Sequence, residues 1–192
     1  SEDPYCVNLF KDDPRTEDTL LVSKDNALAN VFVSVAQGLP KDKKWPVPTK
    51  PVIFDQECWF IPHIAGVMAG QPLEFHNSAS TLEVPHGFPE RNKEFSFNVL
   101  EGQKKRVTLK YPETFPLKCD VHPWELAYCH VMDHPFFAVS DKKGQAALAG
   151  LRPGEYELEF WHEKLGVQRK PVRIEAGKTT RMDNVVFKPT RP

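Results

Sequence analysis

Short runs that alternate polar and apolar residues, separated by frequent turn signals, constrain the fold of this chain more than any other feature. Alternation with a period of two places successive side chains on opposite faces of a β-strand. Turn signals such as Glu101-Gly102 and Pro153-Gly154 punctuate the chain, and no helical heptad accompanies them. We expect strands at residues 31–35, 94–99, 106–111 and 156–161. Many short strands joined by turns predict an all-β sandwich.

Chain length and charge exclude several classes of protein. A chain of 192 residues can form one large domain or two small ones and bury a core without a covalent staple. Its 25 basic and 26 acidic residues leave a net charge of −1, so we expect no binding to nucleic acid. No apolar run approaches 18 residues, so we expect no transmembrane segment. The N-terminus carries no basic and apolar leader, so we expect any signal peptide to have been removed or never to have existed.

The sequence suggests two β domains, one inserted into the other. Residues 40–50 contain three prolines and four lysines, a composition that cannot pair as a central strand and indicates a loop or domain junction. The strand and turn at 137–144, with the Pro-Gly turn at 151–156, resemble a carboxypeptidase regulatory-like domain, a small transthyretin-like β-sandwich. The first half of such a domain matches 27–35. This resemblance implies a chain divided into an N-terminal extension at 1–19, a first regulatory-like part at 20–44, an inserted domain at 45–133 and a remainder at 134–192.

The segment Cys119-Asp120-Val121-His122-Pro123-Trp124-Glu125 is the strongest candidate for a functional site. A Cys and a His three residues apart on a tight loop between strands can both face one metal ion. Thiolate together with imidazole suits copper, zinc or iron rather than magnesium or calcium. Pro123 stiffens the loop, and Trp124 can limit the access of solvent to a metal. The alternative is a buried thiol beside a surface histidine, because Cys-x2-His also occurs by chance.

This segment resembles the copper-binding loop of plastocyanin-like proteins, the cupredoxins. In that family Cys, then His three residues later, then Met three after that bind copper. Upstream, the run 58–63 and the run 70–77 match the family pattern of strand, Gly turn, strand and Asn. The wider likeness, from 3–6 to 159–163, is to the methylamine-utilization-like type, which joins a cupredoxin to a regulatory-like segment. The resemblance implies an exported copper or electron-transfer protein.

Two positions depart from the family pattern. Glu125 stands where the family has its axial Met. The family's first His ligand follows the Asn by six residues, and counting from Asn77 reaches Glu83. Carboxylates in these two places would favour Cu(II) over Cu(I) and lower the reduction potential.

A rival alignment supplies a histidine instead. Val84-Pro85-His86-Gly87 resembles the Pro-His of plastocyanin-type proteins, with a loop three residues longer. On this alignment His86, Cys119 and His122 form the ligand trio, Glu125 is an axial oxygen, and Glu83 orients a histidine. The sequence leaves both alignments open.

Four cysteines permit three full pairings, and their density is too low for a disulfide scaffold. We expect a disulfide between Cys6 and Cys58, because Cys6 heads an irregular N-terminal segment with little else to hold it. A bridge between Cys119 and Cys129 is the alternative, and it would prevent thiolate ligation. One disulfide beside a functional thiol fits a periplasmic or secreted protein about as well as four free thiols fit a cytosolic one.

The sequence therefore predicts an exported copper-binding protein of cupredoxin type, with an atypical Cys/His/Glu site. Electron transfer to a redox partner protein or copper handling is favoured over enzymatic activity. Two alternatives remain: a metal-free or zinc-binding interaction module on the same scaffold, and a small copper enzyme with an open coordination position.

Overall fold

The computed structural model describes residues 3–12, 14, 19–183 and 185–188, and the chain divides into two compact units. Unit 1 contains the described N-terminal residues up to 14 together with Trp45–Pro135. Unit 2 contains the described residues from 19 to Lys44 and from Phe136 onward. The compact units divide after residues 44 and 135, and the domain boundaries that the resemblance implies, after residues 44 and 133, stay a prediction. The N-terminal residues, expected as a separate extension, group with unit 1.

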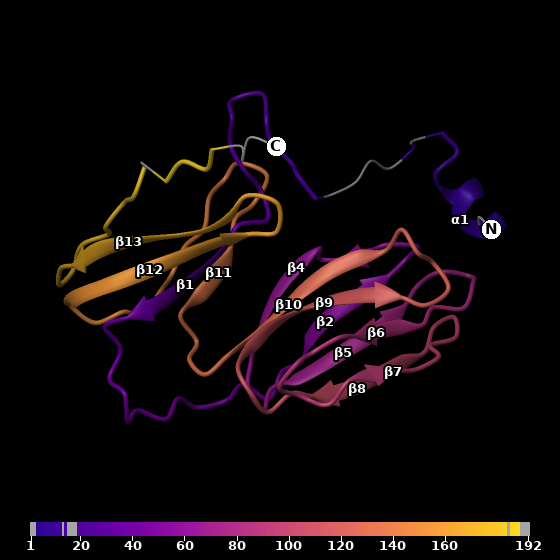
Figure 1. Cartoon of the computed structure of the whole chain (residues 1–192), viewed down its shortest axis with the longest axis horizontal. Coiled ribbons are helices and arrows are strands. Elements are labelled where there is room, and N and C mark those ends of the chain that lie inside the picture. Colours follow the sequence, from indigo (N-terminus) through magenta and orange to yellow (C-terminus); the bar gives the residue numbers. More distant parts are fainter. Residues whose placement is uncertain (1–2, 13, 15–18, 184, 189–192) are drawn as a thin grey trace. The chain divides into compact units, whose positions relative to one another are not determined.

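The described elements are one short helix and thirteen strands (Figure 1). In chain order they are α1 (Pro4–Leu9), β1 (Phe32–Gln37), β2 (Val52–Gln56), β3 (Phe60–Ile61), β4 (Ile64–Met68), β5 (Pro72–Asn77), β6 (Pro85–Gly87), β7 (Phe95–Ser96), β8 (Lys104–Thr108), β9 (Glu113–Cys119), β10 (Leu126–Met132), β11 (Phe137–Val139), β12 (Gly154–His162) and β13 (Gly166–Ile174). The all-β class predicted from the alternation is confirmed. No described helix has the length and apolar character needed to cross a bilayer.

Unit 1 is a sandwich of two mixed sheets. One sheet has the strand order β4-β10-β9-β6-β7, with β4 and β10 parallel, and the other has the order β3-β2-β5-β8, with β2 and β5 parallel. Alternate residues of both sheets face a shared aromatic and aliphatic core, as period-two patterning requires. The core includes Phe54, Leu73, Phe75, Phe115, Leu117, Cys129 and Val131.

Two expected strands are shorter than their alternation suggests. The strand expected at 106–111 ends at Thr108, because Asn92 Oδ1 accepts hydrogen bonds from the backbone N–H of Lys110 at 2.6 Å and of Tyr111 at 2.9 Å. A side-chain acceptor thus takes donors that a strand ladder would use. Within 94–99, only β7 and an isolated bridge between Val99 and Glu83 form.

The helix α1 and a disulfide organise the N-terminal segment of unit 1. Asp3 caps the helix, since its Oδ1 accepts from the backbone N–H of Tyr5 at 2.8 Å and of Cys6 at 3.2 Å. A disulfide joins Cys6 to Cys58, in the turn between β2 and β3, with a Cα–Cα distance of 5.7 Å. The helix is therefore tied to the end of the β2 strand.

Unit 2 is built on one antiparallel sheet with the order β11-β1-β12-β13. Four consecutive residues of β1, Phe32–Val35, are buried, so both faces of this central strand are covered. After β1, Gly38 has φ +102°, and a Cβ placed there would lie 2.5 Å from the backbone oxygen of Glu155 on β12. The chain can approach β12 this closely only because residue 38 has no side chain.

Replacing Gly38 with alanine is expected to destabilise the protein by about 2–3 kcal/mol, since it adds both a clash with backbone and a disfavoured φ. Gly166→Ala is the matched control, because Gly166 has φ +79° but a Cβ added there would meet nothing within 4 Å. We expect that control to lose only about 1 kcal/mol. Chemical denaturation measures both, and equal losses would contradict the close approach.

Candidate metal centre

Four buried side chains at one end of unit 1 direct donor atoms at a common point. They are Glu83, Cys119, His122 and Glu125, and their ligand atoms all lie within 4.8 Å of one another. The residues are between 0% and 4% exposed. The structure therefore brings together two carboxylates, a thiol and an imidazole, all shielded from solvent.

Strand pairing and one tight turn place these residues. Cys119 is the last residue of β9, and the loop to β10 turns back with a hydrogen bond from the Glu125 N–H to His122 O at 3.0 Å. Glu83 is held by reciprocal backbone hydrogen bonds with Val99, at 3.1 and 2.8 Å. The β6–β9 register sets Pro85 opposite Cys119, which brings the chain just before β6 up to the thiol.

The spacing of the donor atoms fits a single metal ion. His122 Nδ1 lies 2.9 Å from both Glu83 Oε2 and Glu125 Oε1. Cys119 Sγ lies 3.3 Å from Glu83 Oε2 and 3.7 Å from His122 Nδ1. Metal–ligand bonds of about 2.0–2.3 Å in a tetrahedral site separate neighbouring ligand atoms by about 3.3–3.8 Å. Small outward shifts of the carboxylates would reach those separations.

Neighbouring groups also donate hydrogen bonds to the ligand residues. Glu83 Oε1 accepts from the backbone N–H of Cys58 at 3.3 Å, and Glu125 Oε2 accepts from Gln56 Nε2 at 3.2 Å. Cys119 Sγ accepts from the backbone N–H of Val84 at 3.4 Å. Supporting contacts of this kind orient metal ligands before the metal arrives.

The N-terminal segment and an indole ring cover the far side of His122. The Nε2 atom of His122 lies 3.6 Å from Asp3 Oδ2 and 3.9 Å from Cys6 Sγ. The ring of Trp124 stacks on the imidazole at a centroid distance of 5.0 Å, and its Nε1–H donates to Cys58 O at 3.0 Å. Asp3, Cys6 and His122 form a second cluster of potential ligands, but Cys6 is engaged in the disulfide.

Burial and charge shift the ionisation of the cluster. Burial would lower the pKa of His122, but its hydrogen bonds to Cys119, Glu125 and Glu83 outweigh burial and raise this pKa to about 12. Burial raises the pKa of Glu125 to about 7, against the hydrogen bond from His122. Burial also raises the pKa of the Cys119 thiol. A cation between these groups would stabilise the deprotonated carboxylates and thiolate, as the proton shared with His122 does in part.

His86, the rival candidate, lies outside the cluster. Its Nδ1 bonds Asp120 Oδ1 and its Nε2 bonds Glu94 Oε1, both at 2.8 Å. Burial lowers the pKa of His86, but the bonds to Asp120 and Glu94 outweigh it and the pKa is raised. Its ring stacks on Phe88 at 3.9 Å. The structure thus brings Glu83, and not His86, to Cys119.

The remaining cysteines are both free thiols. Cys119 lies in the cluster, and Cys129 is buried in the core on β10, opposite Phe115 of β9. The alternative disulfide between Cys119 and Cys129 does not form, so the thiol of Cys119 is available as a ligand.

Gln56, Cys58 and Asp3 contribute to the site and were not found from the sequence. Gln56 carried a usable signal, because alternation along β2 places it on the same face as the core residue Phe54. A glutamine at such a position requires polar partners. No local pattern in the sequence points to Asp3 or to the backbone of Cys58. These groups reach the site only because the disulfide and the turn after β2 bring them there.

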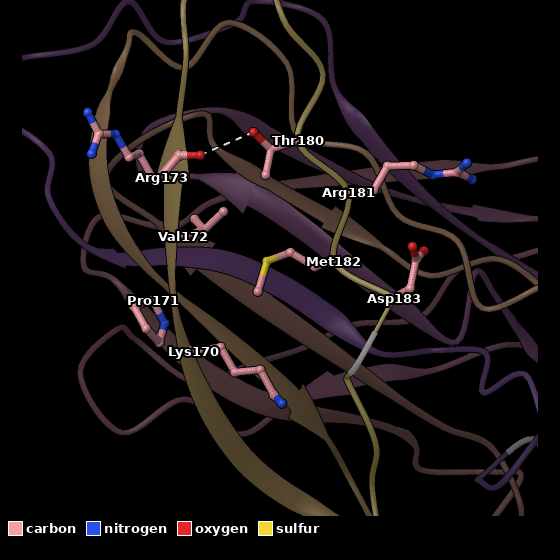
Figure 2. Close-up of a pocket in the computed structure, with 8 residues that line it drawn as sticks. All are labelled: Lys170, Pro171, Val172, Arg173, Thr180, Arg181, Met182 and Asp183. Carbon is pink, nitrogen blue, oxygen red and sulfur yellow. Dashed lines mark hydrogen bonds between the residues drawn. The ribbon is translucent and has the colours of Figure 1, made fainter.

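The residues that line a groove in unit 2 do not direct ligand atoms at a common point as the cluster in unit 1 does. Residues 170–173 of β13 and residues 180–183 line it. Figure 2 shows Met182 directed toward β13, whereas the guanidinium groups of Arg173 and Arg181 extend in opposite directions. Thr180 Oγ1 donates to Arg173 O at 3.1 Å, which ties the segment to the strand.

No protein-family model matches the sequence, and no curated protein matches it significantly. Among solved structures, a Cu-containing nitrite reductase from Thermus scotoductus is 19% identical, with a TM-score of 0.42 over 52% of this chain and 26% of the reductase chain. A purple cupredoxin from Nitrosopumilus maritimus is 14% identical, with a TM-score of 0.37 over 43% of this chain and 98% of its own. Amicyanin from Paracoccus versutus is 15% identical, with a TM-score of 0.39 over 52% of this chain and 97% of its own. The chain spans about a quarter of the length of the reductase chain.

Proposed function

We propose that unit 1 is a cupredoxin-like domain that binds one copper ion through Glu83, Cys119, His122 and Glu125, and that it serves in electron transfer or copper handling. The observation that carries this proposal is the convergence of four buried donor atoms within 4.8 Å. Each carboxylate presents one oxygen to that point while a protein donor holds the other.

The donor set favours copper. A thiolate and an imidazole suit late transition metals, and among the divalent ions Cu²⁺ forms the most stable complexes with such ligands. Two carboxylates add hard, anionic oxygens, which stabilise Cu(II) relative to Cu(I). Copper would supply one-electron chemistry. The chain's own residues would hold the ion rigidly, and Trp124 with the N-terminal segment would exclude water from it.

The Cys6–Cys58 disulfide supports an exported protein. Disulfides persist in oxidising compartments, so we place the protein in a periplasm or outside the cell, with a redox partner protein of its own. We further propose that unit 2 is a regulatory-like β domain of the kind found in methylamine-utilization-like proteins. Unit 2 is formed by two separate stretches of the sequence, one before Trp45 and one after Pro135, and this division supports that assignment.

Addition of Cu(II) to purified protein is expected to fill one site per chain and produce a visible thiolate-to-Cu(II) charge-transfer band. Zn(II) should bind the same ligands without colour, and it serves as the control. Protein that stays colourless and takes up no copper would overturn the proposal.

A metal-free module is the second candidate, and one observation favours it. The two 2.9 Å contacts of His122 Nδ1 with Glu83 and Glu125 form a hydrogen-bonded network without a metal. Mass spectrometry of the native protein after dialysis against a mixture of Cu(II) and Zn(II) distinguishes the three states: copper-bound, zinc-bound and metal-free.

The fourth ligand is tested by two substitutions. Glu83→Gln is expected to weaken copper binding and change the electron-spin resonance spectrum, because Glu83 Oε2 lies within the cluster. His86→Ala should change neither, since both of its ring nitrogens bond exposed carboxylates instead. A spectrum that responds only to His86→Ala would restore the rival alignment.

A further inference from the structure

Gln56, the last residue of β2, lies between the two carboxylates of the cluster. Its side chain is fully buried, and its Nε2 donates to Glu83 Oε2 at 3.3 Å and to Glu125 Oε2 at 3.2 Å. An amide nitrogen has two hydrogens, so each carboxylate receives one. Among the described residues, Gln56 Oε1 has no hydrogen-bond partner.

This one-sided bonding is costly for a structural residue. A buried acceptor without a donor destabilises the folded state. An apolar side chain beside Phe54 would avoid that cost, but it would leave both carboxylates without the donor that Gln56 supplies. The satisfied end of the amide faces only the two carboxylates, so its donors are what the position requires.

We propose that Gln56 is a positioning residue of the metal centre, which sets the spacing and the orientation of Glu83 and Glu125. This inference rests on the proposed function of the site. By holding Glu125 Oε2, Gln56 leaves Oε1 as the oxygen that faces His122 and Cys119. By reaching Glu83 as well, it keeps two buried anions together before a metal ion neutralises them.

The chemistry of the side chain explains why glutamine occupies this position. Glutamate would add a third buried carboxylate next to two others, and it lacks hydrogens to donate at neutral pH. Lysine would bring a cation that competes with the metal for the same oxygens. Methionine fills a similar volume but donates no hydrogen bond. Only a neutral side chain with two donors satisfies both carboxylates.

Gln56→Met separates a positioning role from a structural one. We expect the variant to bind Cu(II) about 10- to 100-fold more weakly, with an altered electron-spin resonance spectrum. Its metal-free form should also lose stability, because Met leaves Glu83 Oε2 and Glu125 Oε2 without the amide donors, so the copper affinity and the spectrum carry the test. A residue that only stabilised the fold would also lower the stability of the metal-free form, but it would leave the copper affinity and the spectrum unchanged.

Gln71→Met is the matched control. Gln71 is also buried, but it bonds the backbone, with Oε1 accepting from Met68 N at 3.0 Å and Nε2 donating to Lys50 O at 2.9 Å. We expect this control to lose stability and to keep the wild-type copper affinity and spectrum.

The outcomes are distinguishable. Wild-type copper affinity and spectrum in folded Gln56→Met, as judged by circular dichroism, would overturn the role of Gln56 while the copper site stands. Wild-type protein that binds neither Cu(II) nor Zn(II) would overturn both. If Gln56→Met does not fold, Gln56→Asn keeps a neutral amide but shortens the side chain by one methylene, so its donors no longer reach both carboxylates, and its copper affinity decides in the same way.

Discussion

Replacing Cys119 with serine is expected to abolish the visible absorption of the copper-loaded protein and to weaken copper binding strongly. The band arises from the thiolate, and Cys119 contributes the one thiol in the cluster. Structural Zn²⁺ sites have binding free energies of about 10–16 kcal/mol, and if a copper site of four ligands is similar, one ligand contributes about 3 kcal/mol, or more than a hundredfold in affinity. Competition with a chelator of known affinity measures the loss.

Cys129→Ser is the control for that substitution. Cys129 is the other free thiol, and it is fully buried among apolar core residues of unit 1. Serine there would bury a hydroxyl group, so we expect a loss of stability with the copper band retained. A band that disappears in Cys129→Ser and persists in Cys119→Ser would show that copper binds elsewhere.

Removing the disulfide, by Cys6→Ala together with Cys58→Ala, is expected to lower the free energy of unfolding by about 4 kcal/mol. The bridge joins residues 52 apart in sequence, and closing a loop of that length in the unfolded chain accounts for the magnitude. Urea denaturation of the metal-free double variant, compared with wild type, measures it. A loss below about 1 kcal/mol would contradict the chain-entropy account.

The same double variant should release its metal faster. The disulfide ties α1 to the turn at Cys58, and this segment covers the Nε2 side of His122 through Asp3 and Cys6. Transfer of copper to an excess of chelator is therefore expected to accelerate. Val7→Ala is a matched control on α1, because the Val7 side chain is half exposed, and it should leave the transfer rate unchanged.

Local patterns in the sequence determined the fold class and one part of the site. Period-two alternation and turn residues act over a few neighbouring positions, which is why strands such as β12 could be predicted closely from 156–161. The grouping of Cys119, His122 and Glu125 is also local, because one tight loop carries all three. Where a distant side chain takes the backbone donors, as Asn92 does at Lys110 and Tyr111, the local pattern predicts a longer strand than the one that forms.

Only the tertiary structure showed which of Glu83 and His86 lies beside Cys119, and the reason is strand register. Pro85 pairs with Cys119, so His86 pairs with Lys118 and its side chain leaves the sheet on the other face. A shift of one residue in this pairing would place His86 opposite Cys119 instead. Gln56 likewise reaches the carboxylates through the packing of β2 against strands distant in sequence. Contacts of this kind depend on how separate strands meet, which the local sequence of each strand does not specify.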